Sequence, residues 1–174
     1  MQLTQTIAIT SGFFNPLHSA HLELFKAAKE MSDIHIVGVN SDECCLKKTG
    51  KNSFMPFNER LAVINALKYV DCAVGFDDSD GTACKLLEHI YFTHKKSVDQ
   101  GLIRLLFCNG GDRQHGTTPE ETFVEERLNG KVTMVYGVGG FEKGRSSSDF
   151  LKKHVLETWE KYNGDMEAYK QNKY

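Results

Sequence analysis

Residues 6–31 read TIAITSGFFNPLHSAHLELFKAAKEM. The first four residues form an apolar, β-branched run that predicts a strand, and the end of the segment has a helical period. Between them, Gly12 allows a close approach of the backbone and Pro16 stiffens the turn. His18 and His21 are three residues apart and therefore fall on one face of the first helical turn. Imidazoles beside the unpaired amides of a helix N-terminus form an anion site that suits a triphosphate.

The same alternation of short apolar runs and longer segments of helical period continues along the chain. Most of the short runs are apolar on both faces, as strands of a buried parallel sheet require. Strands are predicted at residues 6–9, 34–39, 72–76, 103–108 and 132–136. Helices are predicted at about 19–31, after Pro56, at 82–91, from Thr118, and from the serines at 146–148 through Trp159.

These elements predict an α/β fold with a Rossmann-like, doubly wound, five-stranded parallel sheet in a single domain. The domain is expected over residues 1–162, followed by a polar, Lys-rich tail at 163–174. Ligands of such open sheets bind at the carboxyl ends of the strands. The turn after the first strand is therefore the expected site.

Composition narrows the classes of partner. The chain has 174 residues, 40% hydrophobic and 25% charged, with a net charge of -2. A chain of this size builds one core, and near-neutrality gives no general field for nucleic acid or an anionic membrane. It has no apolar stretch long enough to cross a bilayer, and its five cysteines lack paired spacing, so we expect a cytoplasmic protein with reduced thiols. The HxxH spacing of the histidines, without further ligands, predicts no protein metal site.

Four segments resemble motifs of the nucleotidyltransferase superfamily. SGFFNPLHSAH at 11–21 is similar to its GxFxPxHxGH motif. Residues 40–71 resemble the strand exit, lysine loop and helix of the cytidylyltransferase and heptose-type branch. CNGGDR at 108–113 resembles the GGD segment of the heptose-type enzymes, and FEKGRSSSDFLKK at 141–153 resembles the start of their last helix. The segments follow the family's order, and each lies at a predicted strand exit or helix start.

The resemblance implies a role for each residue at a matching position. His18 and His21 would contact the triphosphate and stabilise the departing pyrophosphate, and Lys48 would hold phosphate from across the cleft. Arg60 would organise the phosphates or the acceptor. These four are the expected catalytic residues. The expected nucleotide-binding residues are Gly12, Phe13, Phe14, Asn15, Gly110, Gly111, Asp112, Arg145, Ser146, Ser147 and Ser148.

Plainer structural roles also fit several of these residues. Ser146 with Asp149 forms a capping box for a helix. Lys48 is one of several charges in a polar segment. Arg60 fits a helix surface where it would pair with Glu59 or with the neighbourhood of Asp71. The glycines at 110 and 111 fit a turn that follows a strand.

The chain departs from the family's pattern in three places. Ala20 stands where the motif has glycine, and its methyl group narrows the space beside the histidines. Phe141 stands where glycerol-3-phosphate cytidylyltransferase has arginine, as it does in the heptose-type branch, so Arg145 or Lys143 is the hypothesised source of the missing cation. Residues 93–101 form an apparent insertion, which we expect to be a solvated loop.

The resemblance implies an enzyme of the nucleotidyltransferase class (EC 2.7.7). It would transfer CMP, or alternatively AMP, from CTP or ATP to the phosphate or phosphonate of a small metabolite and release pyrophosphate. In-line displacement of this kind needs positioning and charge neutralisation but no covalent enzyme intermediate. Mg²⁺ is expected to arrive with the triphosphate.

The expected partners are the nucleotide and a phosphorylated small-molecule acceptor, with no nucleic acid and no membrane. The resemblance also implies a homodimer. The alternatives are an adenylyltransferase of the heptose-phosphate type, a non-catalytic nucleotide-binding domain on the same fold, and a fragment related to class I aminoacyl-tRNA synthetases, which share the histidine motif.

Overall fold

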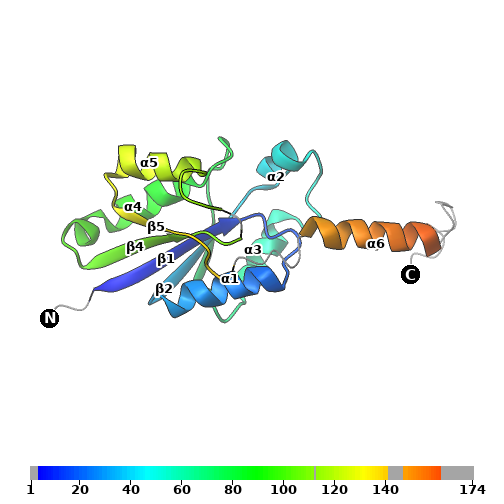
Figure 1. Ribbon diagram of the computed structural model, residues 1–174, viewed down its shortest axis with the longest axis horizontal. Coiled ribbons are helices and arrows are strands. Elements are labelled where there is room, and N and C mark those ends of the chain that lie inside the picture. Colours follow the sequence, from blue (N-terminus) through cyan, green and yellow to red (C-terminus); the bar gives the residue numbers. More distant parts are fainter. Residues whose placement is uncertain (1–3, 112, 141–146, 162–174) are drawn as a thin grey trace.

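A computed structural model describes residues 4–111, 113–140 and 147–161 of the chain. Its centre is a five-stranded sheet in which every neighbouring pair of strands is parallel, in the order β3-β2-β1-β4-β5 (Figure 1). The strands are β1 (Gln5–Gly12), β2 (Ile34–Val39), β3 (Cys72–Gly75), β4 (Ile103–Cys108) and β5 (Val132–Val135). The predicted fold class and all five predicted strands are confirmed.

Six helices accompany the sheet in the described part of the chain. They are α1 (Ser19–Glu30), α2 (Asp42–Thr49), α3 (Phe57–Asn65), α4 (Cys84–Asp99), α5 (Pro119–Leu128) and α6 (Ser147–Lys161). None of the helices in these residues is long and apolar enough to span a bilayer. The proposed tail at 163–174 lies outside the described residues.

Two layers of helices cover opposite faces of the sheet. α1 and α3 pack on one face, where Phe25 and Ile64 bury Val37 and Val39 of β2. α4 and α5 pack on the other face, where Leu87 is one of the α4 residues that cover β1 and β4. In Figure 1 the two layers lie below and above the sheet. The strands therefore present apolar side chains on both faces, as predicted.

The strand order places the topological switch point between β1 and β4. From β1 the chain proceeds outward through β2 to β3, then crosses back to β4 and proceeds through β5 on the other side. The loops that leave the carboxyl ends of β1 and β4 therefore diverge, which opens the crevice where ligands of such sheets bind. Gly12 ends β1 and Cys108 ends β4 at this crevice.

The segment expected to be a lysine loop is a helix. α2 begins where the Ser41 side chain accepts a hydrogen bond from the Cys44 amide (3.0 Å), and it ends at Gly50, whose φ of 70° is left-handed. Ser at an N-cap and Gly in the left-handed region after the last turn are ordinary helix boundaries. Lys48 therefore projects from the last turn of a helix.

The prediction of a solvated loop at 93–101 was wrong. α4 continues through this region to Asp99, and Val98 is buried against the core together with Tyr91, seven residues earlier. Seven residues are two helical turns, so both side chains lie on the face that meets the sheet. The His-Lys-Lys run belongs to the same helix.

Candidate active site

The turn after β1 is built around a buried phenylalanine. Phe14 has a left-handed φ of 50°, is 3% exposed and packs edge-on against His21 (5.0 Å between ring centroids) and Phe25 (5.1 Å). A Cβ at Gly12 would come within 2.9 Å of the Phe14 ring. Glycine at position 12 therefore lets this ring pack beneath the turn and fix the start of α1.

The two histidines form a stacked pair at the N-terminus of α1. Their ring centroids are 3.8 Å apart with 26° between the planes, and the backbone N–H of His18, the N-cap, donates to Nδ1 of His21 at 3.3 Å. Because Nδ1 of His21 accepts this bond, its Nε2 carries the proton in the neutral ring. His21 therefore holds an N–H donor beside the unpaired amides of the helix start.

Both imidazoles favour the neutral form. Burial, and to a smaller extent His18, lowers the pKa of His21 from 6.5 to about 4. Burial also lowers the pKa of His18. Near pH 7 both rings are therefore neutral, and the packing around them holds their N–H dipoles in place. Preorganised donors of this kind are the ones that stabilise developing charge most effectively.

Lys48 reaches toward this turn from α2. Its Nζ lies 5.9 Å from the centroid of the Phe13 ring, and its Cε lies 3.2 Å from where a Cβ at Gly81 would stand. The lysine is exposed. The structure thus brings the cation of Lys48 to the side of the crevice that faces Phe13, on a long side chain that can follow a phosphate.

The glycines after β4 lie at the opposite side of the switch point. A Cβ at Gly110 would come 3.1 Å from the Val138 carbonyl oxygen and 3.3 Å from Leu24 of α1, so glycine keeps this exit close to the helix. Gly111 has a left-handed φ of 68° with open space beside it. Both follow the end of β4 at the switch point, and their contact with a nucleotide stays a prediction. Asp112 lies outside the described residues.

The structure corrects the prediction for Arg60. Its side chain is 0% exposed, so it neither lies on the helix surface nor faces the crevice. The guanidinium donates to the carbonyl oxygens of Met55 (3.0 Å), Phe13 (2.7 Å) and Asn40 (2.9 Å) and to the carboxylate of Asp42 (2.6 Å). Arg60 is therefore a positioning residue that joins the turns after β1 and β2 to the start of α3.

Asn15 also uses its side chain within the protein. Its Oδ1 accepts a hydrogen bond from the Met55 amide (3.0 Å), and its Nδ2 donates to the Cys45 sulfur (3.7 Å). These bonds tie the turn after β1 to the segment before α3 and to α2. Asn15 therefore shapes the crevice through the neighbours that it holds.

A buried carboxylate supports the same edge of the sheet and was missed by sequence reasoning. Asp78, 4% exposed, accepts hydrogen bonds from Asn40 Nδ2 (2.8 Å) and from the amide and hydroxyl of Ser41 (2.8 and 2.7 Å). Burial alone would raise the pKa of Asp78, but the bonds from Ser41 and Asn40 lower it below its ordinary value. The position of Asp78 in the short segment that follows β3 was the available signal in the sequence.

The serine segment is described only in part. Ser147 and Ser148 begin α6, while Arg145 and Ser146 lie outside the described residues, as does Phe141. The helix start predicted at the serines is confirmed by α6.

The fold and the residues gathered at its switch point define the class of protein. A doubly wound parallel sheet carries a histidine pair at the first helix start, a lysine near Phe13 of the same turn, and glycines at the exit of β4. The class is that of the nucleotidyltransferases.

The chain belongs to the cytidylyltransferase-like family, whose model matches residues 9–152. It is 30% identical over 157 residues to the bifunctional protein HldE of Salmonella arizonae and equally to that of Salmonella newport. Each match covers 88% of this chain, which spans only 28% of those relatives' length.

Two solved structures share the fold. The lipopolysaccharide core biosynthesis protein from Thermoplasma volcanium has a TM-score of 0.54 at 22% identity, covering 79% of this chain and 99% of that one. A nicotinate-nucleotide adenylyltransferase candidate from Vibrio parahaemolyticus has a TM-score of 0.53 at 14% identity, covering 88% of each chain.

Replacing Arg60 tests its positioning role. Arg60→Ala leaves three main-chain carbonyl oxygens and Asp42 without their donor, so we expect the free energy of unfolding, measured by urea denaturation, to fall by about 3 kcal/mol or more. Arg104→Ala, which removes an exposed arginine from β4, is the control and should cost much less. Equal stability of the two variants would contradict the role.

The lowered pKa of His21 predicts a dependence of stability on pH. The unfolded chain binds a proton at His21 near pH 6.5, whereas the folded chain binds it only near pH 4. Stability from this group is therefore complete above pH 6.5 and is lost as the pH falls toward 4. His21→Gln keeps an acceptor for the N-cap amide but cannot titrate.

We expect the free energy of unfolding of the wild type to fall by about 2 kcal/mol more than that of His21→Gln between pH 7 and pH 5. Urea denaturation at each pH measures it. His89→Gln, on α4 and away from the turn, controls for the loss of any histidine. Parallel curves for the wild type and His21→Gln would show that His21 is not desolvated in the folded chain.

Proposed function

We propose that the chain transfers a nucleoside monophosphate, with CMP favoured, from its triphosphate to the phosphate or phosphonate of a small metabolite. The observation that carries the proposal is the stacked pair of His18 and His21 at the N-terminus of α1, at the switch point of the sheet. The cytidylyltransferase-like family model supports CTP as the donor. The alternative donor is ATP, which the resemblance of CNGGDR to the heptose-type segment supports.

In the proposed reaction an oxygen of the acceptor's phosphate attacks the α-phosphorus of the nucleotide. A new P–O bond forms, the bond from the α-phosphorus to the α–β bridging oxygen breaks, and pyrophosphate leaves with the electron pair. His18 and His21 would donate N–H bonds to the phosphate oxygens on which charge accumulates. Lys48 would neutralise charge from the opposite side, and the in-line geometry supplies the remainder of the rate.

Mg²⁺ in this proposal is bound by the phosphates of the nucleotide. Residues 4–111, 113–140 and 147–161 contain no group of three or more His, Cys, Asp or Glu side chains that could hold a metal ion. Mg²⁺ usually keeps several waters and is held by substrate phosphates with one or two carboxylates. Bound there, it would screen the charge of the triphosphate while the histidines and Lys48 orient it.

A pyrophosphate-release assay with CTP and ATP, over a panel of sugar, polyol and amino-acid phosphates, tests the function. We expect release with one of the two nucleotides and at least one acceptor. His18→Ala removes a fixed donor, so kcat should fall roughly 10²- to 10³-fold while the fold is retained. His89→Ala, outside the turn, is the matched control and should keep the wild-type rate.

Other outcomes separate the alternatives. Nucleotide binding without turnover for any acceptor would favour a non-catalytic nucleotide-binding domain. A rate that is unchanged in His18→Ala would remove the histidine pair from the mechanism.

A further inference from the structure

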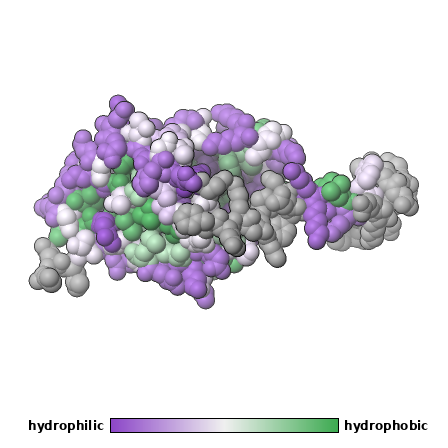
Figure 2. Space-filling view, viewed as in Figure 1, coloured by the Kyte–Doolittle hydropathy of each residue, from purple (hydrophilic) through white to green (hydrophobic). Residues whose placement is uncertain are grey.

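The helix that carries Lys48, α2, is held in place mainly by polar contacts. Its buried residues are Cys44 and Cys45, and none of its residues belongs to the hydrophobic core clusters of the described chain. Hydrophilic residues predominate along the upper edge of the molecule, where this helix lies (Figure 2). A helix of eight residues is too short to be stable by itself in water. The place of Lys48 therefore depends on the groups that hold the two ends of α2.

The turn at residues 78–81, between β3 and α4, holds the first end. The Asp78 carboxylate accepts hydrogen bonds from the amide (2.8 Å) and the hydroxyl (2.7 Å) of Ser41, whose oxygen caps α2 at the Cys44 amide. A hydroxyl that donates to Asp78 keeps its lone pairs for the amide of the helix. Asp78 therefore fixes the N-cap of α2 in the orientation that starts the helix.

The same turn contacts the other end of the helix. Nζ of Lys47 lies 3.5 Å from the carbonyl oxygen of Ser79. Lys48 extends past Gly81, where a Cβ would lie 3.2 Å from its Cε and 3.9 Å from its Nζ. The ammonium group of Lys48 also lies over the Phe13 ring, 5.9 Å from its centroid, so the side chain spans from this turn to the turn after β1. Lys47 is thus used by the turn, whereas Lys48 is directed to the crevice.

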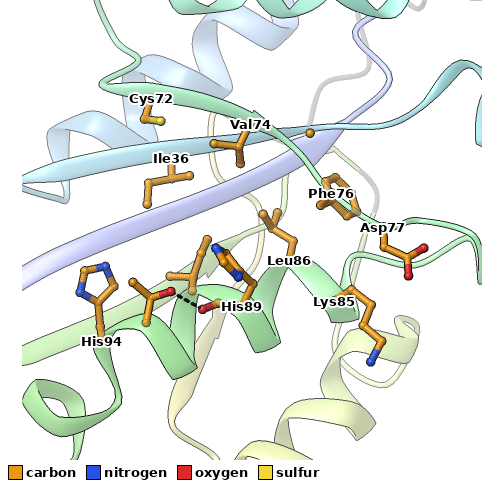
Figure 3. A pocket seen from close by; sticks show the side chains of 12 residues that line it. Ile36, Cys72, Val74, Phe76, Asp77, Lys85, Leu86, His89 and His94 are labelled. Carbon is orange, nitrogen blue, oxygen red and sulfur yellow. Dashed lines mark hydrogen bonds between the residues drawn. The ribbon is translucent and has the colours of Figure 1, made fainter.

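The turn itself is anchored on both sides. Before it, Phe76 packs against the core and lines a groove of about 500 Å³ between β2, β3 and α4 (Figure 3). After it, the amide of the buried Ala83 donates to the carboxylate of Glu120 (2.8 Å). Within it, the Gly81 amide donates to the carbonyl oxygen of Asp78 (2.8 Å). The turn is therefore a firm support for a helix that has little apolar packing of its own.

We propose that the turn at 78–81 positions Lys48 for the triphosphate, with Asp78 and Gly81 as positioning residues. Asp78 sets the start of α2, and Gly81 leaves the space along which the lysine side chain extends. Gly81 has a left-handed φ of 78°, which asparagine also adopts, but a side chain there would displace Lys48. The contact of Lys48 with phosphate rests on the proposed function, whereas its placement by the turn does not depend on it.

Amide hydrogen exchange tests the link from Asp78 to α2. In Asp78→Asn one of the two oxygens that accept hydrogen bonds becomes a donor, so Ser41 loses its fixed orientation. We expect the amides at the start of α2 to exchange roughly fivefold faster, the size of effect that follows the loss of an N-cap. Asp77→Asn is the control, because it keeps an oxygen for the amide that Asp77 binds, and it should exchange as the wild type does.

Nucleotide binding tests the placement of Lys48. Gly81→Asn keeps the backbone angle and fills the space of the lysine side chain, so the Kd for CTP or ATP should rise roughly tenfold or more, as in Lys48→Ala. Gly101→Asn is the matched control. Gly101 has a φ of 73° with nothing within 4 Å of a Cβ, so this variant should bind nucleotide as the wild type does.

A double-mutant cycle separates positioning from a general effect on the fold. In the Lys48→Ala background, Gly81→Asn and Asp78→Asn should change the Kd by less than about twofold, because the group that they position is gone. If Asp78→Asn does not fold, Gly81→Asn carries the test.

Equal effects of Gly81→Asn with and without Lys48 would overturn the proposal. So would wild-type binding by Gly81→Asn when Lys48→Ala binds weakly, or wild-type exchange in Asp78→Asn. If the wild type binds neither CTP nor ATP, the proposed function fails, and the exchange experiment alone decides whether Asp78 supports α2.

Discussion

The buried guanidinium of Arg60 holds together the edge of the sheet on which the active site depends. Four of its five N–H donors are used within the protein, three of them on main-chain carbonyl oxygens from segments far apart in sequence. Its charge is balanced by Asp42, whose side chain is 45% exposed. Carbonyl oxygens and one carboxylate can accept the hydrogen bonds of a buried arginine, because the guanidinium presents its N–H donors in a fixed plane. The turns after β1 and β2 therefore keep one geometry.

That geometry determines the chemistry of the histidine turn. With the Phe13 carbonyl held by Arg60 and the Phe14 ring packed under Gly12, the start of α1 is fixed before a ligand arrives. The same packing removes His21 from water and lowers its pKa, so the site presents neutral N–H donors. A neutral donor attracts a triphosphate less strongly than an imidazolium, but it loses no proton when charge moves to the leaving group. In the proposed reaction the exposed Lys48 would supply the formal charge that the neutral histidines lack.

The strands and the location of the site could be predicted from the sequence, because buried parallel strands are continuous apolar runs and the strand order fixes the switch point. Helix α2 had visible boundary signals in Ser41 and Gly50, but its lysines fit a loop equally well. The seven-residue spacing of Tyr91 and Val98, which is two helical turns, was the pattern in the sequence that indicates a longer α4. No pattern could reveal that Arg60 is buried, because its partners are main-chain carbonyl groups of three segments, which any residue type supplies.

A groove lined by β2, β3 and α4 results from the same strand order that creates the switch point of the sheet. The connections from β1 to β2 and from β2 to β3 proceed in one direction and place α1 and α3 on one face, so right-handed crossovers in the other direction must place α4 and α5 on the other. Two helices on each face cannot cover all five strands, so each face has strands at one edge without a helix over them. On the face that carries α1, the segment after β5 covers this part of the sheet, and its Val138 packs against Leu106 and Ala28. On the face that carries α4, the strands without a helix are β2 and β3, and the groove lies over them. The two faces of the sheet therefore differ, because one is completed by the segment after β5 and the other is left with an open groove.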